Sequence, residues 1–473
     1  MNTSNPLQPP ASVHPLTEQP IKIYPRTVTG RYASWRWVMV WLTQLFFYGM
    51  PWLNWNGRQA LLFDLGERRF YVLGLVLQPQ DFIYLAVLLV ISALALFFFT
   101  AIAGRLWCGY SCPQTVYTEL FLWIERRVEG DRSARMRLDA QPWGWHKLSR
   151  KGTKHGLWLA LALFTGFSFV GYFSPIRELV PALLHPAESP WLWFWVLFYG
   201  AATYGNAGFL REQMCKFMCP YARFQSALID MDSLVIAYDT ARGESRGPRS
   251  RKTDPRSAGL GDCVDCTLCV QVCPTGIDIR NGLQNECIAC AACIDVCNGV
   301  MDRMGYERGL IRYTSGNAVA GGWSPRQMIA RIWRPRVIIY GVLLLVIGSA
   351  WLWSLQQRRD FDALLIKDRG SLARLGAHGS IENTFRLQVT NSQEHARTFE
   401  IRLDGDAGFR IDSATRIEVE AAGTNAMPLR LVMPAEQAAA HAGQTLDVSL
   451  LVMAVDGQDA RSARLPARFT VPR

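Results

Sequence analysis

The feature that most constrains this chain is a doubled cysteine pattern between Cys263 and Cys297. Each half reads CxxCxxCxxxC, which is the ligand spacing of a bacterial [4Fe–4S] site. Three closely spaced thiolates can surround one face of a cluster, while the fourth cysteine points to the neighbouring cluster. This crossed rule predicts one cluster bound by Cys263, Cys266, Cys269 and Cys297, and a second bound by Cys287, Cys290, Cys293 and Cys273. Two linked clusters would form an electron relay.

Zinc and disulfides are the competing interpretations of these cysteines. Zinc sites usually pair one CxxC with a distant CxxC or HxxxH, and they need no third cysteine at the same interval. Paired disulfides require an oxidising compartment, whereas the topology predicted below places this segment in the cytoplasm. Asn298 stands where Pro274 follows the last cysteine of the first half, and we expect it to loosen the turn without removing a ligand. The pattern therefore favours two clusters.

The composition indicates a membrane protein. Hydrophobic residues make up 50% of the 473-residue chain, with 17 Trp and 23 Phe, which suits spanning segments with aromatic belts at the membrane interface. The formal charge of +11 could indicate a nucleic-acid partner. However, Lys and Arg concentrate in the loops between apolar runs, where they orient a membrane protein. We therefore expect a bilayer and no nucleic acid.

Five apolar runs are predicted to span the membrane, at about 37–55, 82–103, 156–173, 191–209 and 337–353. The loops 105–154 and 211–336 are strongly basic, whereas 57–81 is mixed in charge and 174–190 has Arg177 as its one Lys or Arg. The positive-inside rule places the N-terminus and both basic loops in the cytoplasm and the C-terminus outside. This predicts a multi-pass protein of the bacterial inner membrane.

The predicted fold class is a multi-domain membrane protein. It combines a five-helix transmembrane part, a ferredoxin-like α+β insert and an all-β immunoglobulin-like sandwich. The sandwich is expected from about Phe361 onward, where apolar residues such as Phe385, Leu387 and Val389 alternate with polar ones. The sandwich has no cysteine, which suits a docking or stabilising module. The predicted domains are a disordered cytoplasmic tail (1–34), a four-span domain (35–239), the cytoplasmic ferredoxin-like domain with its flexible linker 240–260 (240–315), a linker with the fifth span (316–356) and the periplasmic sandwich (357–473).

Four further cysteines form a second, repeated motif. Each CxxxCP motif follows a predicted span at its cytoplasmic end and precedes an amphipathic stretch, which suggests an internal duplication of two hairpins. Pro113 and Pro220 suit the first position of a helix, so the preceding cysteine is expected to cap that helix. The helix dipole should then lower the thiol pKa. The four residues are Cys108, Cys112, Cys215 and Cys219.

The four CxxxCP thiols are the predicted catalytic residues, and several roles are open. Soft sulfur ligands, with Met214 and Met218 nearby, select Cu(I), although zinc also accepts four thiolates. A redox role without metal is a further option, and so are four buried cysteines that act only as small apolar side chains. The last option leaves the repeated spacing and the repeated proline unexplained.

The two CxxxCP hairpins, the doubled cluster motif, the fifth span and the sandwich together resemble the CcoG family, also called FixG or RdxA/RdxB. These are accessory proteins of cbb3-type cytochrome c oxidase. The resemblance covers the chain apart from its N-terminal tail. It implies two [4Fe–4S] clusters as cofactors and reduction of Cu(II) to Cu(I) for assembly of the oxidase. It also implies copper chaperones or transporters and oxidase subunits as partners, while the cytoplasmic electron donor stays unidentified.

Two other functions compete with copper reduction. The four-span part and the cluster motif are shared with NapH-like membrane ferredoxins, which implies electron transfer with quinol and no copper. The fifth span and the sandwich separate the two types and favour the CcoG type. A third interpretation is a structural assembly factor that holds oxidase subunits through its sandwich and uses the clusters as redox sensors.

Overall fold

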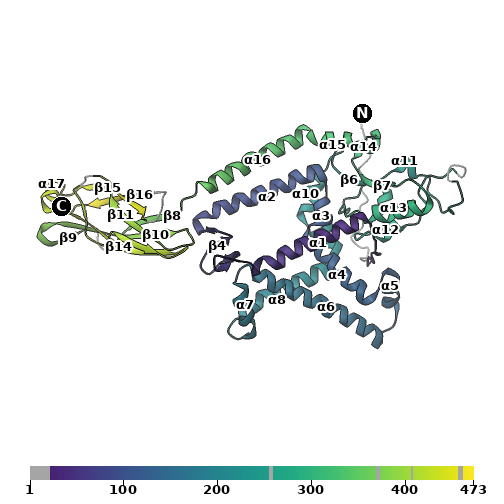
Figure 1. Cartoon of the computed structure of the whole chain (residues 1–473), viewed down its shortest axis with the longest axis horizontal. Helices are drawn as coiled ribbons and strands as arrows, with labels where there is room; N and C mark the ends of the chain where they lie inside the picture. The colour runs from purple at the N-terminus through teal and green to yellow at the C-terminus, as the bar shows by residue number, and fades with distance from the viewer. Residues whose placement is uncertain (1–21, 255–258, 369–372, 406–407, 456–461) are drawn as a thin grey trace. The chain divides into compact units, whose positions relative to one another are not determined.

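The computed structural model describes residues 22–254, 259–368, 373–405, 408–455 and 462–473 (Figure 1). The chain divides into two compact units. The first comprises Met1–Trp52 and Ala86–Ser349, and the second comprises Leu53–Leu85 and Ala350–Arg473.

A helix forms over each of the five predicted apolar runs. These helices are α1 (Arg31–Gly49), α2 (Phe82–Ala103), α6 (Trp145–Val170), α8 (Pro190–Gly205) and α16 (Pro335–Gln356). In the first unit α6 packs against both α4 (Pro113–Glu129) and α8 (Figure 1). A Cβ on Gly166 of α6 would lie 2.3 Å from the Val196 carbonyl oxygen of α8, so only glycine permits this close approach.

Two of these helices are long and apolar enough to cross a membrane. They are α2, extended by the preceding turn to Pro79–Ala103, and α16, with mean hydropathies of 2.8 and 2.1. The other three do not meet this criterion within the described residues. Arg31 and Arg36 lie in α1, the first half of α6 is basic, and α8 has 16 residues before a π-helical turn. The five-span topology therefore stays a prediction.

The segment before α1 has a defined conformation from residue 22. The Arg26 backbone N–H donates to the Gln271 carbonyl oxygen at 2.8 Å, and Lys22 Nζ pairs with Asp139 Oδ2 at 2.6 Å. Asp295 accepts a hydrogen bond from the Ala33 N–H at the start of α1, at 2.7 Å. The prediction of a disordered tail to residue 34 is thus wrong for residues 22–34, and residues 1–21 lie outside the described residues.

The cysteine-rich segment is closed by a two-stranded antiparallel sheet. Strand β6 (Val235–Tyr238) pairs with β7 (Ile311–Thr314), and the helices α12 (Leu268–Gln271) and α13 (Ala292–Met304) lie between them in sequence. The described part of the predicted flexible linker is held in place, because Arg249 donates to the carbonyl oxygens of Gly261 and Cys263. That part of the linker prediction is wrong, and residues 255–258 lie outside the described residues.

Short helices connect these elements in the first unit. They are α3 (Leu106–Tyr110), α5 (Arg132–Ala140), α7 (Ile176–Leu184), α9 (Arg211–Gln213), α10 (Pro220–Leu228), α11 (Thr240–Gly243), α14 (Gly316–Gly321) and α15 (Pro325–Ala330).

The second unit contains the predicted β-sandwich. One sheet has the order β12-β14-β10-β8, with β9 also paired to β10, and the other has the order β13-β11-β15-β16. Phe385, Leu387 and Val389 of β10 point into the core, as their alternation predicted. The strands are β8 (Phe361–Lys367), β9 (Arg374–Leu375), β10 (Ile381–Asn391), β11 (Arg397–Leu403), β12 (Arg410–Ile411), β13 (Arg416–Val419), β14 (Thr424–Met433), β15 (Thr445–Ala454) and β16 (Ser462–Thr470), with α17 (Ala435–Ala440) after β14.

The segment between α1 and α2 belongs to the same unit as the sandwich. It forms β1 (Asn54–Trp55), β2 (Arg58–Gln59), β3 (Leu61–Asp64), β4 (Arg69–Val72) and β5 (Leu75–Leu77). Two of its charged residues form ion pairs with residues of the segment Ala350–Arg473: Arg58 with Glu394, and Asp81 with Arg358. The mixed charge of this loop therefore has a structural cause that the sequence alone did not indicate.

Candidate functional site

The eight cysteines of the doubled motif line two adjacent cavities. Cys269 reaches both cavities, so they share a wall. We name the first group the distal site and the second the proximal site, because the second contacts the CxxxCP segments. The distal site comprises Cys263, Cys266, Cys269 and Cys297, and the proximal site comprises Cys273, Cys287, Cys290 and Cys293.

The two CxxCxxC loops have the same unusual backbone. In each loop the residues on both sides of the central cysteine are left-handed: Asp265 and Thr267 have φ of 50° and 55°, and Ala289 and Ala291 have φ of 54° and 60°. Left-handed residues other than glycine cost about 1 kcal/mol each, so the surroundings must compensate for them. The shared backbone curls each loop around its own cavity.

The helix α13 continues through the last cysteine of the motif. Cys297 lies inside this helix, and the next residue, Asn298, accepts a hydrogen bond from the Gly309 N–H at 3.0 Å. The expectation that Asn298 loosens a turn is wrong. With an N–H that proline lacks, Asn298 lets the helix continue to Met304.

The residues of both sites fit a [4Fe–4S] cluster by their donor chemistry and spacing. Burial raises the pKa of Cys287 and Cys297 to about 12, so a free thiolate is disfavoured and a bound cationic group would have to offset that cost. Burial also raises the pKa of Cys290, and the Arg36 guanidinium opposes this rise. Among the described residues, no three His, Cys, Asp or Glu side chains converge closely enough for a single ion.

The two CxxxCP motifs adopt the predicted cap geometry. Cys112 (φ −61°, ψ 128°) precedes α4 and Cys219 (φ −73°, ψ 110°) precedes α10, and proline occupies the first position of each helix. The first cysteines differ, because Cys108 lies in the α-helix α3 whereas Cys215 lies in a π-helical turn, Met214–Met218. The two motifs therefore share one backbone conformation at their second cysteine and differ in helix type at their first.

The fall in thiol pKa that the cap position predicted is wrong for Cys112. Burial raises the pKa of Cys108 to about 11 and that of Cys215 to about 12, and it also raises the pKa of Cys112. The backbone N–H groups of Gln114 and Thr115 do favour the Cys112 thiolate, as a helix N-terminus should, but desolvation is larger. The thiols of Cys108 and Cys215 are thus protonated at neutral pH until a bound cation displaces the proton.

The CxxxCP segments contact the proximal site directly. Cys108 and Cys215 pack against an apolar cluster that contains Ile288 and Cys290, and Cys215 and Cys290 line one common cavity. On α3, a Cβ at Gly109 would lie 2.7 Å from the Ile288 carbonyl oxygen, so the helix backbone rests on the loop that carries Cys290. We name Cys108, Cys112, Cys215 and Cys219 together the thiol site.

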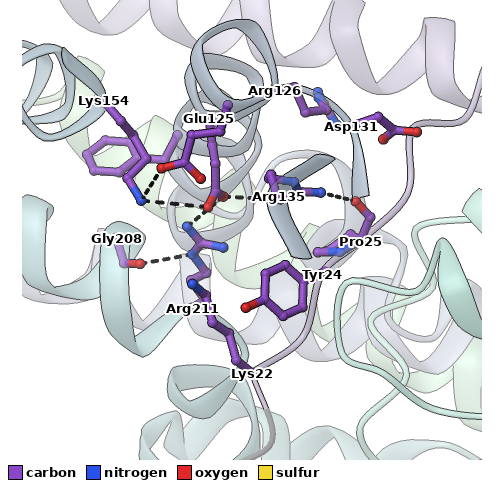
Figure 2. A network of polar contacts seen from close by, with 12 residues as sticks. Lys22, Tyr24, Pro25, Glu125, Arg126, Asp131, Arg135, Lys154, Gly208 and Arg211 are labelled. Carbon is purple, nitrogen blue, oxygen red and sulfur yellow. Dashed lines mark hydrogen bonds and ion pairs between the residues drawn. The ribbon is translucent and has the colours of Figure 1, made fainter. Parts of the chain in front are cut away.

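A buried ion network joins the two CxxxCP segments (Figure 2). Glu125 of α4 is 1% exposed and pairs with Arg211, which precedes Cys215, at 3.0 Å and with Arg135 at 3.3 Å. Lys154 of α6 pairs with Glu129 at 2.9 Å and lies 3.9 Å from Glu125. Burial opposes ionisation of Glu125, but Arg211, Arg135 and Lys154 together hold the pKa of its carboxyl below the usual range.

Three family models match parts of the chain. The model described as "4Fe-4S dicluster domain" matches residues 210–316, which include the distal and proximal sites and the second CxxxCP motif. The model described as "4Fe-4S binding domain" matches residues 85–129, which include the first CxxxCP motif. The model described as "IG-like fold at C-terminal of FixG" matches residues 351–472.

Relatives match over most of the chain. Protein RdxA of Cereibacter sphaeroides is 38% identical over 433 residues, which cover 89% of this chain and 91% of RdxA. The nitrogen fixation protein FixG of Rhizobium meliloti is 38% identical over 422 residues, which cover 83% of this chain and 80% of FixG. The chain belongs to the FixG/RdxA family. The resemblance inferred from its motifs is thereby confirmed.

Membership of the FixG/RdxA family establishes the general activity. The chain is an iron–sulfur electron-transfer protein with [4Fe–4S] domains, and it is an oxidoreductase in that sense. A solved structure, the FixG-related protein from Vibrio parahaemolyticus, is 17% identical, with a TM-score of 0.21 over 24% of this chain and 97% of that one.

Several residues at the site of this FixG/RdxA family member were not found from the sequence. Gln225 is fully buried and accepts a hydrogen bond from Cys108 Sγ at 3.3 Å. Arg105 donates to the carbonyl oxygens of Asn285 and Ala222, which ties the thiol site to the proximal loop. Arg36 lines the cavity between Cys215 and Cys290. No sequence motif marks these three residues, because each is brought to the site by contacts that form only in the folded chain.

Replacing Gly109 by alanine in this FixG/RdxA family member is expected to separate α3 from the proximal loop. The new Cβ would lie 2.7–2.9 Å from the backbone of Ile288 and Ala289, which cannot yield as a flexible side chain would. Overpacking of this kind costs about 2 kcal/mol. Thermal unfolding and iron content of the purified protein check this. Gly205→Ala is the control, since its Cβ meets nothing within 4 Å, and an equal loss of stability in both variants would refute the close contact.

Glu125→Gln is expected to destabilise the first unit of this FixG/RdxA family member by about 3 kcal/mol, because it leaves buried cations without their carboxylate. The folded pKa of Glu125 is lowered, so its contribution is complete above the unfolded value of about 4.3 and is lost as the pH falls through the folded value. Unfolding at neutral and acid pH should therefore show a difference from wild type that shrinks in acid. Glu178→Gln, at an exposed position, should leave the stability unchanged at both pH values. A stability loss in Glu125→Gln that is the same at both pH values would contradict the ion network.

Proposed function

We propose that this protein passes electrons from a reduced cytoplasmic carrier, through [4Fe–4S] clusters at its distal and proximal sites, to the thiol site, where Cu(II) is reduced to Cu(I). The observation that carries the proposal is that Cys108 and Cys215 pack in one apolar cluster with Cys290 of the proximal site. The two sequence motifs are thereby parts of one route rather than two separate sites.

The order of the relay follows from contacts and exposure. Of the twelve cysteines, all of which the structure describes, Cys266 of the distal site is the exposed one, so a carrier protein would donate there. Cys269 borders both cavities and links the distal to the proximal site. Cys290 and Cys215 then border the next cavity. The clusters, when bound, supply one-electron storage, and the chain's cysteines hold them in this sequence.

Copper is the substrate in this proposal. Each Cu(II) takes one electron and leaves as Cu(I), and the relay is refilled by the carrier. Thiolates stabilise Cu(I) over Cu(II) because both partners are soft, which favours the reduction. The thiols of Cys108 and Cys215 are protonated when no ion is present, so copper binding would release protons. Gln225, which accepts from Cys108 Sγ, orients that sulfur.

The setting of this reaction is proposed to be the bacterial inner membrane. The segments Leu53–Leu85 and Ala350–Arg473 form one unit, as expected if both lie on the periplasmic side. The two helices of spanning length, α2 and α16, are segments through which the chain passes between the two units. In this topology, the relay is cytoplasmic and the sandwich faces copper chaperones or subunits of a cbb3-type oxidase during its assembly.

A second candidate function is electron transfer to or from a quinone without copper. The contact of Cys108 and Cys215 with Cys290 supports this function too, because the thiols adjoin the proximal site whether or not they bind a metal. In this function, the CxxxCP thiols would line the electron route only.

Copper X-ray absorption tests the proposal against this alternative. Protein loaded anaerobically with one equivalent of Cu(I) should show sulfur-only coordination, and Cys112→Ser with Cys219→Ser should replace sulfur by lighter scatterers. Copper bound through nitrogen or oxygen in the wild type would refute the thiol site as the place of reduction and leave the quinone function.

A further inference from the structure

The distal and proximal sites have similar loops but different charged neighbours. At the distal site, Arg280 lines the cavity beside the four cysteines. Its guanidinium is fully paired, with Asp278 Oδ2 at 2.7 Å and with Asp265 Oδ1 at 2.5 Å. Two carboxylates thus pair directly with the one cation that lines the distal cavity.

The proximal site has a cation with no such partner. Arg36 of α1 lines the cavity that also contains Cys290 and Cys215. Within the described residues its guanidinium makes no hydrogen bond or ion pair, and its Nε is buried. Glu119 and Asp295 favour the Arg36 charge from a distance, but their direct partners lie elsewhere: Glu119 pairs with Arg126 at 3.1 Å, and Asp295 accepts from the Tyr32 and Ala33 N–H groups.

A second cation beside the proximal site has only neutral partners. Arg105 is 8% exposed, and its guanidinium donates to the carbonyl oxygens of Asn285 and Ala222. Asn285 lies two residues before Cys287, so the positively charged guanidinium of Arg105 lies beside the proximal loop. Among the described residues, neither cation has a carboxylate in direct contact, in contrast to Arg280.

A positive charge with no carboxylate in direct contact favours the reduced form of a nearby redox group, because reduction adds one negative charge and the buried surroundings screen it weakly. We propose that Arg36, supported by Arg105, raises the reduction potential of the cluster at the proximal site above that at the distal site. This inference rests on the proposed relay and gives it a direction. One electron leaves the distal site and arrives at the proximal site, beside the thiol site, with no atom transferred.

The test is a redox titration followed by electron paramagnetic resonance, on the full chain in detergent and without copper. Cys266→Ser and Cys293→Ser assign the two signals to the distal and proximal sites. Arg36→Gln should move the proximal midpoint to a more negative value and leave the distal one unchanged, and Arg36→Lys should restore it. Arg127→Gln is the matched control, since this exposed arginine borders a neighbouring cavity without cysteines and should shift neither midpoint.

The converse variant is Asp265→Asn. It releases Arg280 from one carboxylate without a change of shape, and asparagine tolerates the left-handed backbone at this position, so the distal midpoint should rise. Unchanged midpoints in Arg36→Gln and in Asp265→Asn would overturn the inference, as would equal shifts at both sites. Because copper is absent, this result is independent of copper reduction: correct shifts with an inactive thiol site would refute only the proposed function.

Discussion

Replacing Cys108 or Cys215 by alanine is expected to lower the rate of copper reduction by at least about 100-fold while both clusters remain. Loss of a residue that only supports a metal ligand typically costs 10–100-fold, so loss of a ligand itself should cost no less. Neither cysteine belongs to the distal or proximal site, so iron content and cluster absorbance should match those of the wild type. Rates are measured anaerobically with a chelator specific for Cu(I).

The control for this prediction lies inside the same motif. Ser111 lies between Cys108 and Cys112, and its replacement by alanine should leave the rate within about twofold, the range typical of small changes away from a site. Unchanged reduction in Cys108→Ala and Cys215→Ala would remove the thiol site from the mechanism. A loss of iron in these variants would show instead that the motif supports the proximal loop.

Paired cysteine variants are expected to have the second large effect, because the crossed ligand sets predict which pairs are redundant. Cys297→Ala should remove the distal cluster, which halves the iron content from about eight to about four atoms. Adding Cys263→Ala should remove no further iron, since both residues line the same cavity. Combining Cys297→Ala with Cys287→Ala should instead remove nearly all of the iron, because each substitution removes a ligand of a different cluster. Iron analysis and electron paramagnetic resonance of the purified variants give the result.

The uncrossed arrangement makes the opposite prediction. If each half of the motif held its own cluster, Cys297→Ala with Cys287→Ala would lose one cluster, and Cys297→Ala with Cys263→Ala would lose two. Copper reduction should disappear in every variant that lacks the proximal cluster, because that site contacts Cys108 and Cys215.

The cysteine groups and the cap geometry could be predicted from the sequence because both depend on local spacing. Three ligands within seven residues must lie together, and Pro113 and Pro220 fix a helix start wherever they occur. The alternation in β10 is equally local, and the side of the strand that carries Phe385 is buried as expected.

The thiol pKa could not be predicted because it depends on tertiary packing. The N-cap position of Cys112 was correctly inferred, and its backbone N–H contacts do favour the thiolate. However, desolvation by segments far away in the sequence outweighs them, and burial of this kind leaves no local pattern. The role of Arg36 could not be predicted for the same reason, because a buried Nε without a hydrogen-bond partner among the described residues is visible only in the folded chain.

Segment boundaries were also decided by distant contacts. Residues 22–30 resemble a disordered tail in composition, yet Arg26 and Lys22 have partners at Gln271 and Asp139. The loop between α1 and α2 forms strands whose charges meet Glu394 and Arg358. A composition rich in proline or of mixed charge predicts no structure by itself, and it becomes ordered only where a partner surface exists.

If the clusters and the thiol site form one route to copper, electrons lost by the clusters must appear in copper. The most direct measurement reduces the protein anaerobically, adds Cu(II), and follows cluster absorbance together with a Cu(I)-specific chelator. We expect one Cu(I) for each electron that the clusters lose. In Cys108→Ala and Cys215→Ala we expect little cluster oxidation and little Cu(I). Clusters that stay reduced in the presence of Cu(II), yet are oxidised by a quinone, would contradict it.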